Sequence, residues 1–265
     1  MTSVDFDQVR KLIHEHAGIT LGPDKRAMVY GRLSRRLRET GHASFTAYLQ
    51  WLESLTGPAG TQERQEFVNC LTTNLTAFFR EEHHFQTLAA ELKMRRGGPL
   101  RIWCNAASTG EEPYSLAITV AEALGKGANV RIVASDIDTR VLAVAERGVY
   151  DAQARGLSEA RLHQHFLRGK GVNDGAIRIK PELTQAVEFR YFNLMDERWT
   201  IGDPFDIVFC RNVMIYFDHA TQRRVLERMH GAMKPGSLLF AGHSENFSES
   251  GDLFRLRAQT VYERV

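Results

Sequence analysis

Hydrophobic positions in the first 70 residues recur at helical spacing, and no segment there has a convincing strand pattern. Residues 45–52 carry aromatic and leucine side chains three or four positions apart, which predicts a helix. The run 56–60 contains two glycines and a proline, and it predicts a break after that helix. We interpret the aromatic stripe as core packing rather than as a binding surface. The pattern predicts an N-terminal helical domain over residues 1–72.

From about residue 100 the pattern alternates between strands and helices. Apolar runs predict strands at 101–104, 130–134, 187–192, 205–210, 237–241 and 260–265. Helical periodicity predicts helices over 116–124, from Asp138 to Gly148, and over 221–233. This alternation is typical of an α/β fold with a doubly wound, mostly parallel sheet, which we assign to residues 73–265. Ligands of such folds bind at the carboxyl ends of the strands.

One long interval, 148–188, interrupts the alternation. It contains Gly169, Gly171 and Gly175, followed by a possible short strand at 176–179. We interpret it as a small inserted antiparallel β-subdomain at about 160–190. The glycines have two interpretations: they form a tight turn, or they let another backbone approach for pairing at a strand edge.

Composition narrows the class of protein. A length of 265 residues suits either one large α/β domain or a domain with a smaller companion. With 43% hydrophobic and 25% charged residues, the chain does not resemble a disordered, collagen-like or disulfide-dense protein. The formal charge of +2 predicts no general attraction to nucleic acid or membranes.

Three cysteines, Cys70, Cys104 and Cys210, lie far apart and include no C-x-x-C pair, so neither a disulfide framework nor a zinc cluster is indicated. The N-terminus has no signal-peptide pattern, and no stretch approaches the roughly 18 apolar residues of a membrane span. We therefore expect a cytoplasmic protein without direct membrane insertion.

Basic residues gather between Lys25 and Arg38, where six occur without one acid. On a helical wheel Lys25, Arg32 and Arg36 share one face, and Arg35 lies close to it. The simplest interpretation is a solvated helix face. The alternative is a docking face for an acidic helix.

The loop at 105–115 follows the first predicted strand and opens a helix with Pro113 in its first turn. It has neither a Walker nor a G-x-G-x-x-G pattern, so a dinucleotide pyrophosphate is not indicated. Glu111 and Glu112 at the helix N-terminus would repel phosphate, which favours a ligand that carries positive charge.

Asp136 ends the second predicted strand, where α/β nucleotide-binding folds place the acid that accepts ribose hydroxyl hydrogens. A capping role is the alternative for Asp136, and Asp138 is interpreted as the N-cap of the following helix. His83-His84 and the pair His14 and His16 lack the spacing of H-E-x-x-H, so we interpret them as solvated and expect no metal.

Five segments, 74–80, 107–115, 134–137, 209–217 and 241–245, together resemble the CheR-type chemotaxis receptor methyltransferases, and the likeness extends from about residue 5 to the C-terminus. The resemblance implies a class I S-adenosylmethionine methyltransferase fold with an N-terminal receptor-docking domain. It also implies methyl transfer to glutamate γ-carboxylates of receptors, with methyl esters and S-adenosylhomocysteine as products.

The resemblance implies a role for individual residues. The segment that meets the cofactor is matched by Asn74, Thr76 and Arg80, and the residue at the methionine end of the cofactor is matched by Glu111. The acid that binds the ribose is matched by Asp136, and the pair beside the adenine by Asn193 and Leu194. The loop that lines the pocket is matched by Arg211 and Asn212. Arg80 and Tyr216 match the side chains near the methyl group. Without the resemblance, Arg80 would be interpreted as a surface residue and Tyr216 as a core residue.

The resemblance also implies partners. It favours receptor docking on Lys25, Arg32, Arg35 and Arg36, and the three-glycine hairpin is similar to that of the family subset that binds a receptor's C-terminal pentapeptide. We expect a monomer recruited to membrane receptor arrays, with no nucleic-acid partner.

Two other functions stay open. A nucleic-acid methyltransferase is permitted by the basic segment, but enzymes that methylate exocyclic amines often carry Asn/Asp-Pro-Pro-Tyr/Phe where this chain has Cys210-Arg211-Asn212-Val213. A non-catalytic receptor-binding adaptor is the other alternative, and the presence of Asp136, Arg80 and Tyr216 argues against it.

Overall fold

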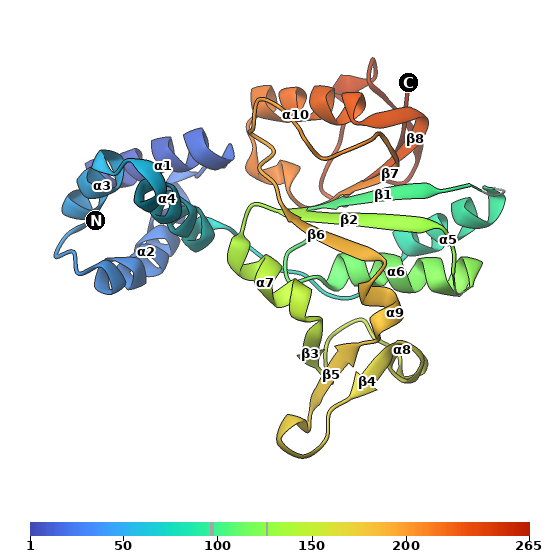
Figure 1. Cartoon of the computed structure of the whole chain (residues 1–265). Coiled ribbons are helices and arrows are strands. Elements are labelled where there is room, and N and C mark those ends of the chain that lie inside the picture. The colour runs from blue at the N-terminus through green and yellow to red at the C-terminus, as the bar shows by residue number, and fades with distance from the viewer. Residues whose placement is uncertain (96–97, 126) are drawn as a thin grey trace.

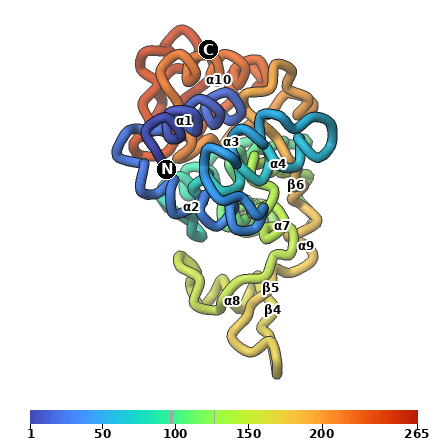
Figure 2. The backbone as a smooth tube through the Cα atoms, turned by 90° about the vertical axis from the view of Figure 1, so that its left-hand side faces the viewer, coloured from blue at the N-terminus to red at the C-terminus, as the bar shows by residue number. Residues whose placement is uncertain are grey.

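The computed structural model describes residues 1–95, 98–125 and 127–265. Its N-terminal part is a bundle of four α-helices, which stands to one side of a larger α/β part (Figures 1 and 2). The helices are α1 (Ser3–Ala17), α2 (Arg26–Thr40), α3 (Phe45–Ser54) and α4 (Gly57–Leu71), with a short 3-10 turn at Pro23–Lys25. The predicted N-terminal helical region is confirmed.

Local sequence explains where these helices begin. Thr2 and Asp5 form a capping box at the start of α1, and the Ser44 side chain accepts a hydrogen bond from the Ala47 N–H at the start of α3. The predicted break at 56–60 is shorter than expected, because α4 already begins at Gly57 with Pro58 in its first turn. Proline has no N–H and is well suited to that position, so the same residues end one helix and start the next.

The α/β part is built on a seven-stranded sheet of order β6-β2-β1-β7-β8-β10-β9. The strands are β1 (Leu100–Asn105), β2 (Val130–Asp136), β6 (Val187–Tyr191), β7 (Phe205–Cys210), β8 (Met233–Ala241), β9 (Phe254–Ala258) and β10 (Val261–Arg264). The first five pair in parallel, whereas β10 pairs antiparallel with β8 and β9. The predicted mostly parallel sheet is confirmed.

Each central strand is buried on both faces, so alternate residues enter two different cores. Cys104 and Phe209 lie in the core that α5 (His83–Met94) and α6 (Glu111–Leu124) cover. Trp103 and Val208 lie in the core under α10 (His219–Gly231), on the opposite face (Figure 1). The sequence pattern did not predict β9, because this edge strand is charged and mostly exposed.

The inserted segment forms a separate three-stranded antiparallel sheet of order β3-β5-β4. Its strands are β3 (Val149–Asp151), β4 (Phe166–Arg168) and β5 (Ala176–Ile179), with α8 (Glu159–His165) and α9 (Pro181–Thr184) beside them. The sheet begins before the predicted range of 160–190, since β3 follows directly after α7 (Thr139–Arg147). It projects from the α/β part below α7 (Figure 1).

No helix among the described residues is long and apolar enough to cross a membrane.

Candidate active site

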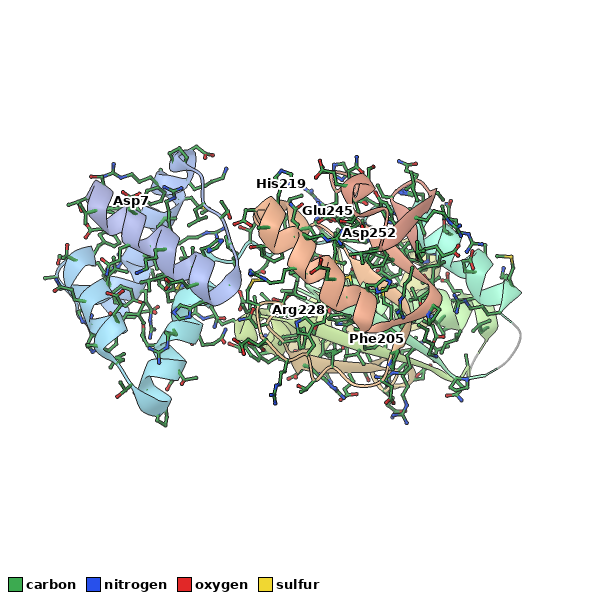
Figure 3. The ribbon with its side chains drawn as sticks, turned by 90° about the horizontal axis from the view of Figure 1, so that it is seen from above. Asp7, Phe205, His219, Arg228, Glu245 and Asp252 are labelled. Carbon is green, nitrogen blue, oxygen red and sulfur yellow. The ribbon has the colours of Figure 1, made fainter. Side chains whose placement is uncertain are left out.

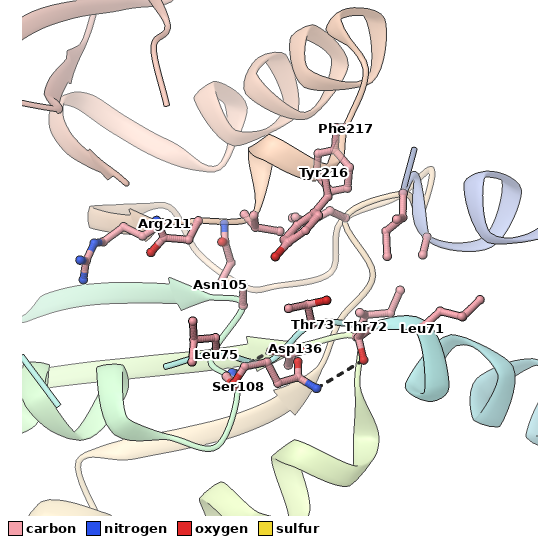
Figure 4. Close-up of a pocket in the computed structure, with 18 of the residues that line it drawn as sticks. Leu71, Thr72, Thr73, Leu75, Asn105, Ser108, Asp136, Arg211, Tyr216 and Phe217 are labelled. Atoms are coloured by element: carbon pink, nitrogen blue, oxygen red, sulfur yellow. Dashed lines mark hydrogen bonds between the residues drawn. The ribbon is translucent and has the colours of Figure 1, made fainter. Parts of the chain in front are cut away.

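A cavity lies between the helical bundle and the carboxyl edge of the large sheet (Figure 4). The bundle lines it with residues of 17–28, and the linker that leaves the bundle contributes residues of 71–80. The loops after β1, β2, β6 and β7 contribute residues of 105–112, 135–137, 192–194 and 211–217. The site is therefore where a parallel sheet is expected to bind a ligand.

Asp136 ends β2 and lines the cavity with only 7% of its surface exposed. One carboxylate oxygen accepts from the Ser108 N–H at 2.8 Å and the other from the Asp138 N–H at 2.9 Å. Burial raises the pKa of Asp136 to about 6, against the lowering effect of these two N–H groups. The backbone bonds fix the side chain, and each oxygen keeps one lone pair for a ligand hydroxyl.

Asp138 caps α7, as predicted, by accepting from the Arg140 N–H at 2.9 Å. Its second oxygen accepts from Thr72 Oγ1 at 2.6 Å and from Asn74 Nδ2 at 2.8 Å. The Asp138 carboxylate therefore also binds the linker between the helical and α/β parts. The sequence pattern did not predict this second contact.

The linker carries the three predicted residues Asn74, Thr76 and Arg80, and all three line the cavity. The Asn74 carbonyl accepts from Ser108 Oγ at 3.0 Å, which joins the linker to the loop after β1. The Arg80 guanidinium donates to the Leu75 carbonyl at 2.9 Å.

Asn193 and Leu194 follow β6 and line the cavity, as expected. Asn193 Nδ2 donates to the His16 carbonyl at 2.7 Å, and Asn193 Oδ1 accepts from the Met195 N–H at 2.9 Å. One side chain thus holds both its own loop and the bundle segment that covers the cavity.

Arg211 and Asn212 follow β7, and both line the cavity. The Arg211 guanidinium is buried, and it lies 2.6 Å from a Glu112 carboxylate oxygen and 3.2 Å from a Glu81 oxygen. Arg211 lowers the pKa of Glu81 to about 2, although burial acts in the opposite direction. Asn212 has a positive φ of 58°, a left-handed conformation that asparagine tolerates better than most residues.

The two glutamates of the loop after β1 have different surroundings. Glu112 lines the cavity and pairs with Arg211, whereas Glu111 is absent from the described lining and accepts from Thr109 Oγ1 at 2.6 Å. Burial raises the pKa of Glu111. The structure therefore places the neighbour of the predicted residue at the cavity wall, and contact of Glu111 with a ligand stays a prediction.

Tyr216 belongs to a 3-10 turn, Met214–Tyr216, and its ring lines the cavity. Its hydroxyl points into the cavity from the side opposite Asp136 (Figure 4). The Tyr216 carbonyl accepts from the Thr20 N–H at 2.8 Å, so the bundle also touches this turn.

Asn105 also lines the cavity, although the sequence pattern did not predict a role for it. It is buried at the end of β1, and its side-chain amide has no nitrogen or oxygen partner among the described residues, although it interacts with the Cys210 thiol on the neighbouring strand. Such a side chain at a cavity wall indicates a polar ligand, since an unpaired buried amide is costly. Its position directly after a predicted strand is the only signal that could have marked it.

Among the residues that the structure describes, one group has metal-ligand character. The ligand atoms of Glu81, His83 and His84 lie within 4.8 Å of one another. The prediction that these histidines are solvated is wrong for His84, because its side chain is fully buried. The Arg211 guanidinium already lies beside the Glu81 carboxylate, and burial lowers the pKa of His84 to about 3, with Arg211 acting in the same direction. Because the Arg211 guanidinium already supplies positive charge there, the geometry gives no reason to assign a metal. The absence of a metal stays a prediction.

The predicted docking face on α2 is less uniform than the helical wheel indicates. Arg36 forms an ion pair with Glu63 inside the bundle, and Arg32 donates to the Leu71 and Thr72 carbonyls at 2.9 and 2.7 Å. Arg35 is exposed, and Lys25 is exposed while also lining the cavity. Lys25 and Arg35 also form ion pairs, with Asp24 and Glu39, but these pairs are exposed and contribute little to stability. They can therefore exchange their partners for a receptor, whereas Arg36 is held inside the bundle and Arg32 is held by carbonyl oxygens.

The three glycines of the hairpin lie between β4 and β5, away from the cavity lining. A side chain at Gly169 would place its Cβ 1.9 Å from the Asn173 carbonyl oxygen. Gly171 and Gly175 have φ values of +61° and +84°. The tight-turn interpretation is confirmed, and pairing of the β4 edge with another chain stays a prediction.

Comparisons with known proteins agree with this arrangement. Residues 74–263 match the family "CheR methyltransferase, SAM binding domain", and residues 4–72 match "CheR methyltransferase, all-alpha domain". The chain is 52% identical to chemotaxis protein methyltransferase 2 of Pseudomonas aeruginosa, with 98% of this chain and 93% of the relative covered. It is 50% identical to the chemotaxis protein methyltransferase of Klebsiella aerogenes and 48% identical to that of Escherichia coli, with 99% of this chain and 90% and 91% of those relatives covered.

Proposed function

Because the chain belongs to the CheR methyltransferase family, we propose that it transfers the methyl group of S-adenosylmethionine to glutamate γ-carboxylates of chemotaxis receptors. The observation that carries the proposal is the cavity itself. It places the fixed carboxylate of Asp136 opposite the hydroxyl of Tyr216, between a helical bundle and the loops of a parallel sheet.

The lining residues suit S-adenosylmethionine. Asp136 would accept hydrogen bonds from the ribose hydroxyls, and Asn193 and Leu194 would lie beside the adenine. The charges of the lining are mixed, since Glu112 pairs with Arg211 while Asp136 is accompanied by Lys25 and Arg80. A mixed lining suits a ligand that carries a carboxylate together with an ammonium and a sulfonium group. The unpaired amide of Asn105 offers one further donor and one acceptor.

When bound, S-adenosylmethionine supplies an electrophilic methyl group on sulfur. A glutamate side chain has an ordinary pKa of about 4.3 and is already ionised at neutral pH, so the chain needs no general base. Its residues must bring the acceptor oxygen into line and exclude water.

We assign the orientation of the reacting groups to Tyr216 and Arg80. The Tyr216 hydroxyl would donate to the acceptor carboxylate and orient it, since it points into the cavity. Arg80 would orient charge on the cofactor or the substrate. Its guanidinium is held by the Leu75 carbonyl, which limits how tightly it can pair with the acceptor. A tight ion pair would stabilise the ground state and slow the transfer.

Two surfaces outside the cavity would bind the receptor. Lys25 and Arg35 of the α2 region would attract the acidic methylation helix, and the β4 edge would pair with the receptor's C-terminal pentapeptide. Tethering by the pentapeptide would raise the local concentration of the enzyme at receptor arrays.

Incubation with methyl-labelled S-adenosylmethionine and a cytoplasmic receptor fragment tests this function. We expect label on the receptor that mild base releases, because a glutamyl methyl ester hydrolyses whereas an N-methyl amine does not. A Y216F variant should retain cofactor binding and lose most of the transfer. A chelator should leave the rate unchanged.

Other results would overturn the proposal. Label on added nucleic acid would support the nucleic-acid methyltransferase, and receptor binding without any transfer would support the non-catalytic adaptor. Base-stable label on the receptor would show a different acceptor atom.

A further inference from the structure

Glu245 lies in the segment after β8, outside the cavity lining, and only 5% of its surface is exposed (Figure 3). Its carboxylate accepts hydrogen bonds from four main-chain N–H groups. One oxygen accepts from Val213 at 3.0 Å and Met214 at 2.8 Å. The other accepts from Asn212 at 3.0 Å and Gly242 at 2.5 Å.

Three of the four donors belong to the loop 211–217 after β7, which carries Asn212 and Tyr216 to the cavity. A cluster of backbone N–H groups is a favourable site for an anion, because their dipoles converge on it. Glu245 supplies that anion from the neighbouring strand end. It therefore joins the loops after β7 and β8.

The contact between the two loops is close. A Cβ at position 242 would lie 2.4 Å from Asn212 Nδ2 and 2.9 Å from the Asn212 backbone nitrogen, so only glycine fits there. Asn212 itself has a left-handed backbone, which needs support from its surroundings. Glu245 provides that support through the Asn212 N–H.

We propose that Glu245 is a positioning residue, whose buried carboxylate fixes the loop 211–217 and thereby sets Asn212 and Tyr216 at the cavity. This inference rests on the proposed function. Only a side chain with two acceptor oxygens satisfies all four donors, since the amide of glutamine would turn N–H groups toward one pair of them.

The first test is hydrogen exchange of the intact chain, which requires no methyl acceptor. In E245Q the peptide that spans 211–217 should exchange at least about tenfold faster, because its amides lose hydrogen-bond partners. The matched control is E249Q, which makes the same change at an exposed glutamate four residues further along. Unchanged exchange in E245Q would overturn the proposal.

The second test is a double-mutant cycle with Y216F, measured as kcat at saturating S-adenosylmethionine and receptor. We expect E245Q to lower kcat at least about tenfold in the wild-type background and less than about threefold in the Y216F background. A merely structural role predicts equal losses in both backgrounds, and that result would overturn the proposal.

If E245Q does not fold, G242A disturbs the same junction while it retains the carboxylate. The added methyl group would push against Asn212, so G242A should reproduce the faster exchange at 211–217. Unchanged exchange in G242A would likewise count against the proposal. If the wild-type chain labels no receptor, the proposed function fails, whereas the exchange experiment still shows whether Glu245 holds the loop.

Discussion

At the residue scale, Asp136 is proposed to bind the ribose as a carboxylate, and it is buried. Two backbone N–H groups hold its carboxylate, but burial outweighs them and raises its pKa from the ordinary 3.8 to about 6. Between these two values the folded chain holds more protons than the unfolded chain. The contribution of Asp136 to stability therefore falls as pH rises from about 4 to about 6.

The affinity for a ribose ligand should rise with pH, whereas the contribution of Asp136 to stability falls. Adenosine is a suitable probe, since it carries the ribose and has no group that titrates between pH 5 and 8. We expect its Kd to be nearly constant above pH 7 and about tenfold higher at pH 5, where about one tenth of Asp136 is ionised.

Calorimetry from pH 8 to pH 5 measures this dependence. D136N is the control, because it should bind adenosine weakly with little dependence on pH. If the Kd of the wild-type chain were equally independent of pH, Asp136 would not be the acid that binds the ribose.

At this scale, Asp136 could be predicted from its place at the end of a strand, whereas Asn193 and Arg211 were indicated only by the family resemblance. All three line the cavity. No role was predicted for Asn105 or Glu245, because an asparagine or a glutamate at those positions does not distinguish a ligand contact from a buried structural contact.

At the element scale, the basic side chains of α2 have two different roles, one inside the bundle and one at its surface. The Arg36 side chain is 17% exposed and forms an ion pair with Glu63, which also accepts from the Tyr48 hydroxyl at 2.8 Å. The Arg35 side chain is 77% exposed and pairs with Glu39 one turn away. A helical wheel places both arginines near one face, but only the neighbouring helices decide which one is buried.

Stability measurements should separate these two arginines. R36A leaves the buried Glu63 without its cationic partner, so it should lower the free energy of unfolding by about 3–5 kcal/mol. R35A removes an exposed pair and should cost about 0.5 kcal/mol or less. Denaturation in urea measures both variants, and similar losses would contradict the division.

Charge reversal at Arg35 tests receptor docking. R35E should raise the KM for a receptor fragment several-fold and leave S-adenosylhomocysteine affinity unchanged, because Arg35 lies outside the cavity lining. R255E is a matched control, since the Arg255 side chain is 70% exposed and also pairs with one glutamate. Methylation kinetics that R35E leaves unchanged would exclude docking through this residue.

The hairpin of the small sheet offers a second test at this scale. G169A must displace the turn from the Asn173 carbonyl, whereas G171A meets no atom within 4 Å and carries only the cost of a left-handed backbone, about 1–2 kcal/mol. We expect the wild-type chain to bind a receptor C-terminal pentapeptide in calorimetry. G169A should weaken binding at least about tenfold and G171A less than about threefold. If the wild-type chain releases no heat on titration with the peptide, tethering by the pentapeptide is excluded.

At the scale of the whole molecule, several contacts join the helical bundle and its linker to the α/β part around the cavity. Asn193 donates to the His16 carbonyl, the Tyr216 carbonyl accepts from Thr20, and Asp138 accepts from the linker. His14 also lies 2.9 Å from Asp218, beside His219 at the end of α10 nearest the bundle (Figure 3). The bundle is thus a wall of the site as well as a proposed docking domain.

D138N should weaken this junction selectively. Asparagine still caps α7, but its amide would face the Asn74 amide, so the contact with the linker is lost. We expect S-adenosylhomocysteine affinity to fall about three- to tenfold, which corresponds to about one hydrogen bond. Calorimetry measures this change, with S158N as a control for replacement of a cap on the distant α8. Wild-type affinity in D138N would show that the linker contact does not shape the cavity.

The sequence by itself determined the helical and α/β parts, the mostly parallel sheet, the inserted hairpin and the loops that carry the site. These features follow from the periodicity of apolar residues and from residues at strand ends, which are local properties. Only the tertiary structure decided that Glu112 rather than Glu111 reaches the cavity wall, that Arg36 is internal, and that Glu245 supports the Tyr216 loop. Each depends on segments far apart in sequence that packing brings together, and a pattern along one segment does not contain the position of its neighbours.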